Sequence, residues 1–297
     1  MGAHPRHTRR GARRVHPVFS TGMPPLLPRP IGVFDSGVGG LSILREMRRQ
    51  MPAEPAVYFA DQDHVPYGPR PLEQVRSFSE GITRFLLDQG ADLIVVACNT
   101  ASAAALKQLR QTFPDVPFVG MEPAVKPAAE VTRSGVVGVL ATPATFQGEL
   151  YASVVERFGQ GVRLVNQTIP GLVEQIEAGY LEAPETEALI RRALEPILRA
   201  GADTIVLACT HYPFVIPVIS RLAGPGVTVI DPAPAIARQA ARLRPPPTRD
   251  LPAPARGGLT LVSSGDPHQL EAMSRRLIGE GGLALWATWS DGNLALV

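Results

Sequence analysis

The chain's two cysteines end two nearly identical segments. Residues 90–98 read GADLIVVAC and residues 201–209 read GADTIVLAC. Each segment predicts a buried strand that ends at a thiol, Cys98 or Cys209, and is followed by a polar turn. Two thiols from equivalent positions suit the movement of a proton from one face of a carbon atom to the other. One thiolate would remove the proton and the opposite thiol would return it.

A thiol with a pKa of about 8.5 needs a partner that ionises it or takes its proton. Polar residues follow four predicted strands, and one of these turns offers a carboxylate and another an imidazole. In open α/β sheets, ligands bind beyond the carboxyl ends of the strands, where helix N-termini present N–H groups to an anion such as a carboxylate. The turns are Asp35-Ser36, Cys98-Asn99-Thr100, Thr142 to Thr145, and Cys209-Thr210-His211.

Composition narrows the classes of function. The 297 residues are enough for two domains, and the net charge of +2 argues against nucleic acid as the main partner. Lys107 and Lys126 are the only lysines, and neither is placed like the lysine that binds pyridoxal phosphate. Two cysteines build neither a disulfide framework nor a four-ligand zinc site, so we expect no metal. We also expect no membrane span, because no apolar run is long enough.

Strands and helices alternate along the chain, as in a parallel sheet with helices on both faces. The pattern begins at residues 31–34 and restarts at residues 136–140, which indicates an internal duplication. We therefore predict an α/β fold with two pseudo-symmetric three-layer αβα domains, mostly parallel sheets and an active site in the interdomain cleft. The predicted parts are a disordered basic extension (1–29), a first domain (30–122 plus 231–297) and a second domain (123–230).

Expected strands and helices follow from apolar periodicity. After the first strand we expect helices at 41–50, 72–89 and 101–111, and a strand at 56–60. The second half predicts helices at 150–158, 172–178 and 184–200, with strands at 163–166 and 227–231. A helix to about residue 243 is expected after the last of these strands. A strand at 259–263 and a helix at 269–277 are expected to pack back on the first half.

Four motifs together resemble the signatures of bacterial glutamate racemases, which supply D-glutamate for peptidoglycan without a cofactor. The motifs are residues 35–42 (DSGVGGLS), 66–68 (PYG), 98–101 (CNTA) and 209–213 (CTHYP), and the resemblance extends to residues 264–267 (SGDP). It implies that Cys98 and Cys209 are the acid/base thiols, assisted by Asp35 and His211, and that Glu177 lies near His211. The substrate-binding residues that it implies are Asp35, Ser36, Pro66, Tyr67, Gly68, Asn99, Thr100, Thr142, Thr145, Thr210 and His211.

Two alternatives stay open at this point. Aspartate racemases, hydantoin racemases and maleate isomerases share the duplicated fold and the paired cysteines. A two-domain binding protein with structural thiols is the other alternative, but it would need an export signal, and residues 1–29 contain no apolar signal-peptide core. The resemblance implies a cytoplasmic homodimer that binds L- and D-glutamate.

Overall fold

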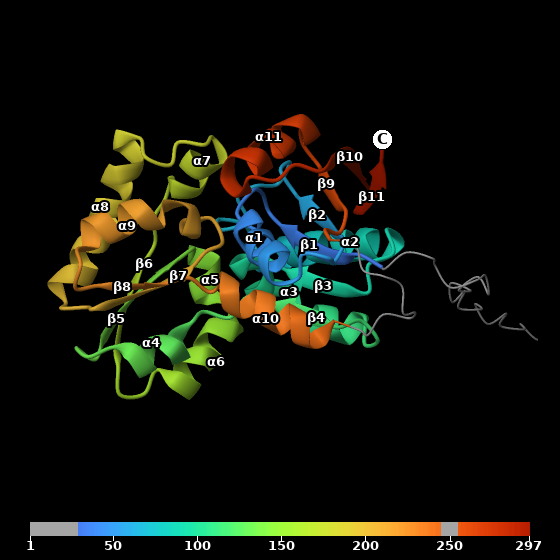
Figure 1. Cartoon of the computed structure of the whole chain (residues 1–297). Helices are drawn as coiled ribbons and strands as arrows, with labels where there is room; N and C mark the ends of the chain where they lie inside the picture. The colour runs from blue at the N-terminus through green and yellow to red at the C-terminus, as the bar shows by residue number, and fades with distance from the viewer. Residues whose placement is uncertain (1–28, 245–254) are drawn as a thin grey trace, which may run out of the picture.

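The computed structural model describes residues 29–244 and 255–297, which form two α/β halves side by side (Figure 1). The predicted basic extension lies outside the described residues, apart from its last residue. So does the proline-rich segment at residues 245–254, for which the sequence predicts a surface loop.

The first half contains a seven-stranded sheet in the order β11-β10-β9-β2-β1-β3-β4. All neighbouring strands are parallel except the C-terminal hairpin β10–β11. The inner strands are continuous apolar runs that are buried along their whole length, as expected where helices cover both faces. The strands are β1 (Ile31–Asp35), β2 (Ala56–Ala60), β3 (Leu93–Val96), β4 (Phe118–Gly120), β9 (Leu259–Ser263), β10 (Leu283–Ser290) and β11 (Asn293–Leu296).

The second half repeats the central part of that topology. Its four parallel strands run in the order β6-β5-β7-β8, which matches β2-β1-β3-β4 position by position. The strands are β5 (Val136–Ala141), β6 (Arg163–Gln167), β7 (Thr204–Ala208) and β8 (Thr228–Ile230). The predicted fold class is therefore confirmed, including its pseudo-symmetry. The exact domain boundaries stay a prediction. The strands of each sheet all lie within one of the two predicted domains.

Helices cover both faces of each sheet (Figure 1). In the first half α1, α10 and α11 cover one face, and α2 and α3 cover the other. In the second half α8 and α9 lie opposite α4 and α6. The bounds are α1 (Leu41–Gln50), α2 (Leu72–Asp88), α3 (Asn99–Thr112), α4 (Val125–Val131), α5 (Pro143–Gln147), α6 (Glu149–Phe158), α7 (Leu172–Glu177), α8 (Pro184–Arg199), α9 (Ile216–Ala223), α10 (Ala233–Leu243) and α11 (Pro267–Ile278), with a 3₁₀ turn at Tyr212–Val215.

The hydrophobic core is continuous between the halves. One buried cluster runs from the α1 and α10 side of the first sheet to the α8 and α9 side of the second sheet, and it includes Cys209. Cys98 belongs to a second cluster on the α2 and α3 side of the first sheet. The two thiols are therefore anchored in different layers of the molecule.

The structure differs from the sequence prediction in two places. The C-terminal hairpin and the short elements β4, α4 and α5 were not expected from apolar periodicity, because β4, α4 and α5 have only three, seven and five residues and the hairpin is only half-buried. Strand pairing also stops before each cysteine, so Cys98 and Cys209 begin the turns and do not end the strands.

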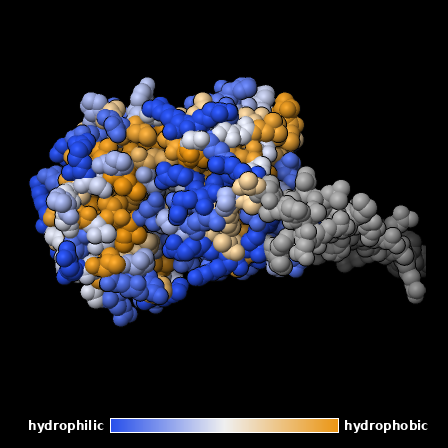
Figure 2. All heavy atoms as spheres, viewed as in Figure 1, coloured by the Kyte–Doolittle hydropathy of each residue, from blue (hydrophilic) through white to orange (hydrophobic). Residues whose placement is uncertain are grey.

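Charged and polar residues occupy much of the face drawn in Figure 2, and apolar residues gather at its upper right edge, where the C-terminal hairpin lies. Leu283, Trp286, Leu296 and Val297 are exposed there. No helix in the described part of the chain has both the length and the apolar character to cross a membrane.

Candidate active site

Four strand ends meet at one small cavity. Ser36, Cys98, Thr142 and Cys209 follow β1, β3, β5 and β7, and all four line it. They converge because β1 and β3 are neighbours in one sheet and β5 and β7 in the other, so their carboxyl ends share an edge. The full lining is Ser36, Pro66, Tyr67, Gly68, Cys98, Asn99, Thr100, Thr142, Val173, Cys209, Thr210 and His211.

The cavity is small. Its volume of about 20 Å³ is room for about one water molecule. An amino acid can enter only if the two halves separate or the lining side chains retreat. Once closed, the site excludes bulk water from both thiols, and exclusion of water strengthens every charge interaction within it.

Cys98 caps the helix that follows it. Its backbone is extended, and its Sγ accepts the N–H of Ala101 at 3.4 Å. Burial raises the pKa of the Cys98 thiol well above its ordinary value, and the charge of Asp35 raises it further. Cys98 is therefore a protonated thiol in this closed arrangement.

Asp35 is fully buried at the end of β1. Its Oδ2 accepts the N–H of Gly40 at 2.5 Å and lies 3.3 Å from Thr210 Oγ1. Burial raises the pKa of this carboxyl, although the charge of His211 opposes the rise. A carboxyl with a raised pKa next to a thiol is suited to exchange a proton with it.

The partner of Cys209 is an imidazole held by a carboxylate. His211 Nδ1 lies 3.9 Å from Cys209 Sγ, and His211 Nε2 lies 2.6 Å from Glu177 Oε1. Burial alone would lower the pKa of His211, but the hydrogen bonds to Cys209 and Glu177 and their charges raise it well above its usual value. Both ring nitrogens then donate, which is the imidazolium form.

Buried polar atoms without a partner lie at the same place. Among the described residues, the buried side-chain atoms that lack a hydrogen bond are Asp35 Oδ1 and both amide atoms of Asn99. Buried polar groups are nearly always paired in folded proteins, and exceptions concentrate where a ligand completes the pairing. Asn99 also lines the cavity. These atoms are therefore the first candidates to contact a bound substrate.

The glycine-rich turn after β1 is shaped by the second half of the chain. A Cβ atom on Gly37 would lie 2.0 Å from Glu177 Oε1, and one on Gly39 would lie 2.3 Å from His211 Nδ1. Neither position tolerates a side chain, because the Glu177–His211 pair packs directly on the turn. The glycines therefore serve the close approach of the two halves.

Four more of the predicted substrate-binding residues lie in or beside the cavity wall. Thr100 Oγ1 lies 2.9 Å from Thr142 Oγ1, so the hydroxyl groups of two strand ends meet across the halves. Thr145 is not part of the lining; its Oγ1 lies 2.9 Å from Thr142 Oγ1 and supports that side chain from behind. Tyr67 lines the cavity, but its hydroxyl donates to Asp61 and is not available to a substrate.

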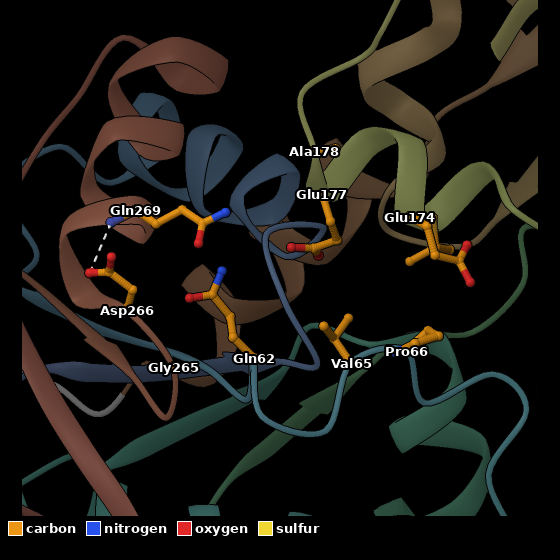
Figure 3. A pocket seen from close by; sticks show the side chains of 10 residues that line it. Gln62, Val65, Pro66, Glu174, Glu177, Ala178, Gly265, Asp266 and Gln269 are labelled. Atoms are coloured by element: carbon orange, nitrogen blue, oxygen red, sulfur yellow. Dashed lines mark hydrogen bonds between the residues drawn. The ribbon is translucent and has the colours of Figure 1, made fainter. Parts of the chain in front are cut away.

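Sequence reasoning missed Val173. Like Pro66, it lines both the cavity and an adjacent open pocket. The open pocket has a volume of about 420 Å³ and is drawn in Figure 3. Figure 3 shows the Glu177 carboxylate directed from α7 toward Gln62 and Gln269, whereas the Glu174 carboxylate points away from them. Val173 lies four residues before Glu177 and so shares its helix face, which is the signal that could have identified it.

The described residues contain neither a metal-binding cluster nor a lysine at the cavity. Within residues 29–244 and 255–297, no group of three His, Cys, Asp or Glu side chains is arranged to hold a metal ion. Both lysines have exposed side chains that pair with Glu149 and Glu130, and neither lines the cavity.

A family model described as Asp/Glu/Hydantoin racemase matches residues 31–240. The chain belongs to the Asp/Glu/Hydantoin racemase family. Within this family, the glutamate racemase of Roseiflexus sp. (strain RS-1) is 50% identical over 252 residues, which cover 84% of this chain and 92% of the relative.

Solved structures in the family have the same fold. The glutamate racemase of Bacillus anthracis superposes with a TM-score of 0.78 at 29% identity, covering 89% of this chain and 98% of that one. The Escherichia coli glutamate racemase, solved with L-glutamate and the activator UDP-MurNAc-Ala, superposes with a TM-score of 0.75 at 31% identity. That superposition covers 91% of this chain and all of the other (100%).

Proposed function

We propose that this protein is a glutamate racemase that interconverts L- and D-glutamate by a two-base proton transfer without a cofactor. The observation that carries the proposal is that Cys98 and Cys209 follow equivalent strand ends and line the same small cavity. The 50% identity to a glutamate racemase over most of the chain supports glutamate as the substrate.

The two thiols have different surroundings. An imidazolium at His211 lies beside Cys209, and burial raises the pKa of the Cys98 thiol. With one enantiomer bound, Cys209 takes the Cα proton: the C–H bond breaks, an S–H bond forms, and its electron pair stays on the substrate. The Cys98 thiol then gives its proton to the opposite face of the same carbon, which inverts the centre and leaves Cys98 as the thiolate.

The reverse direction starts with Cys98 as the base. The forward reaction leaves Cys98 as the thiolate; when Cys98 instead carries a proton, Asp35 is the neighbouring acceptor, and its raised pKa suits it to take that proton. His211 then keeps Cys209 supplied with a proton. The two thiols therefore need different helpers, which explains why the repeated segments diverge immediately after the cysteine.

The substrate carboxylate must be held without a basic side chain nearby. The N-terminus of α3, a helix of 14 residues, begins at Asn99 and presents free N–H groups and a positive dipole end. We assign contacts with the substrate to Asn99 and to Ser36, Thr100, Thr142 and Thr210. Gly68 and Pro66 complete the wall through their backbone and ring.

The proposal includes a cellular role. D-glutamate production for peptidoglycan in the cytoplasm accords with the E. coli relative, which was solved with the activator UDP-MurNAc-Ala. A homodimer belongs to the same proposal and rests on the family resemblance alone. Light scattering after size-exclusion chromatography tests the dimer.

The deciding assay is circular dichroism of L-glutamate, L-aspartate and a hydantoin, each incubated with the protein and no pyridoxal phosphate. We expect the signal of L-glutamate to decay to zero while the others persist. If only the signal of L-aspartate or of the hydantoin decays, that compound, and not glutamate, is the substrate.

A further inference from the structure

A second buried carboxylate lies just outside the cavity. Asp61 directly follows β2, and none of its side chain is exposed. Four side chains surround it. Tyr67 donates its hydroxyl to Oδ2 at 2.5 Å, and Oδ1 accepts the hydroxyl of Ser264 at 2.9 Å and the indole N–H of Trp289 at 2.8 Å. His64 Nδ1 lies 3.0 Å from both carboxylate oxygens.

These donors come from distant parts of the chain. Ser264 stands at the end of β9, and its hydroxyl also accepts the N–H of Asp63 at 3.0 Å. Trp289 belongs to the C-terminal hairpin, which lies at the edge of the first sheet beyond β9. Asp61 therefore joins the end of the chain to a turn that lines the active site.

We propose that Asp61 is a positioning residue that sets the turn Pro66-Tyr67-Gly68 against the bound substrate, with the C-terminal hairpin as its support through Trp289. The inference rests on the proposed function, because the substrate wall that it concerns is the glutamate site. It also gives a role to the motif at residues 264–267, which contributes no residue to the lining of the cavity.

The turn has little freedom at its outer end. The Tyr67 hydroxyl bond to a buried carboxylate is short and charge-assisted, which makes it stronger than a neutral hydrogen bond. Around it, the His64 ring stacks on Phe78 at 3.9 Å between centroids, and Phe78 lies 5.7 Å from both Tyr67 and Trp289. Aromatic packing of this kind restricts the Tyr67 ring to one position.

At its inner end the turn touches the second half. A Cβ atom on Gly68 would lie 3.0 Å from the Cβ of Thr142, so the backbone of Gly68 passes close to a residue of the opposite wall. A small displacement of Tyr67 would therefore move Gly68 relative to Thr142 and change the width of the cavity. Catalytic constellations lose rate or affinity with misplacements of about 1 Å.

The chain contains a matched pair of tryptophans for the test. Trp289 and Trp286 lie on the same strand, and each donates one indole N–H, Trp289 to Asp61 and Trp286 to the carbonyl oxygen of Ser264 at 3.1 Å. Trp289→Phe removes the donor that supports Asp61. Trp286→Phe removes a bond that anchors the same hairpin without touching the carboxylate.

Steady-state racemisation of both enantiomers by the full chain separates positioning from folding. We expect Trp289→Phe and Asp61→Asn to raise KM for glutamate about tenfold, the usual effect of losing a hydrogen bond to a charged group, with kcat changed less than about twofold. Trp286→Phe should leave KM unchanged. A purely structural role would lower the active fraction, and hence kcat, equally in both tryptophan variants.

Thermal unfolding of each variant accompanies the kinetics. If Asp61→Asn does not fold, Trp289→Phe still decides the question, and Tyr67→Phe provides the other end of the same bond. Equal KM values in Trp289→Phe, Trp286→Phe and wild type would overturn the inference. Failure of the proposed function looks different, because the wild-type protein itself would then not racemise glutamate.

Discussion

Glu177 Oε1 binds two partners from different parts of the molecule, His211 Nε2 at 2.6 Å and the backbone N–H of Val38 at 2.7 Å. Val38 belongs to the glycine-rich turn of the first half, and α7 belongs to the second. One carboxylate therefore fixes the orientation of the imidazole and ties the halves together. This geometry points Nδ1 of His211 at Cys209.

Glu177→Gln should lower the pKa of His211, because the amide removes the negative charge that favours the imidazolium. The wild-type pKa lies well above the ordinary 6.5, so the imidazolium stabilises the folded state at neutral pH, and that contribution is lost as pH rises through the raised value. We expect the alkaline limb of the pH profile of kcat/KM to move to lower pH, measured in both directions of the reaction.

Glu174→Gln is the matched control for this shift. Glu174 lies on the same helix and lines the open pocket, but no hydrogen bond joins it to His211 among the described residues. Its pH profile should coincide with that of the wild type. An equal displacement of both profiles would show that the field of the pocket, and not the specific bond, controls the imidazole.

Asp35→Asn should lower the racemisation rate without lowering the stability of the fold. Because the pKa of Asp35 is raised in the folded protein, its stabilising contribution is present below the ordinary 3.8 and is lost as pH rises through the raised value. At pH 8 we therefore expect a melting temperature that is unchanged or higher. Racemisation that needs Cys98 as the base should fall by about 10²–10³, as when an acid/base group is lost. A variant with full activity would exclude the carboxyl from proton transfer.

Cys98→Ser and Cys209→Ser should each abolish racemisation, because a serine hydroxyl cannot supply a base of the required strength at neutral pH. Binding of glutamate, followed by calorimetry, should persist in both variants, since substrate contacts are assigned to other side chains. Full activity in either variant would rule out the two-base mechanism.

Gly39→Ala should lower activity by about 100-fold or more, because its Cβ would lie 2.3 Å from His211 Nδ1 and force the imidazole from Cys209. The overlap should also lower the free energy of unfolding by about 1–3 kcal/mol, the usual cost of overpacking. Gly226→Ala is the control, since a Cβ there meets nothing within 4 Å. Denaturant unfolding and the racemisation assay measure both effects.

The sequence by itself determined the duplicated α/β fold and the thiol pair. Apolar periodicity and the repeated segments are local properties of the chain, and a strand followed by a helix places its polar turn at the ligand-binding edge whatever the rest of the fold does. Asp35 and His211 also stand in such turns, but their roles as helpers of the thiols were implied only by the resemblance to glutamate racemases.

Tertiary structure alone decided how these turns meet. The contact of Glu177 with Val38 joins residues separated by 139 positions, and the bond from Trp289 to Asp61 spans 228. Such pairs depend on the docking of two sheets and a C-terminal hairpin, which no local pattern encodes. The small volume of the cavity and the raised pKa values of Cys98 and His211 follow from that docking, because burial and neighbouring groups determine them.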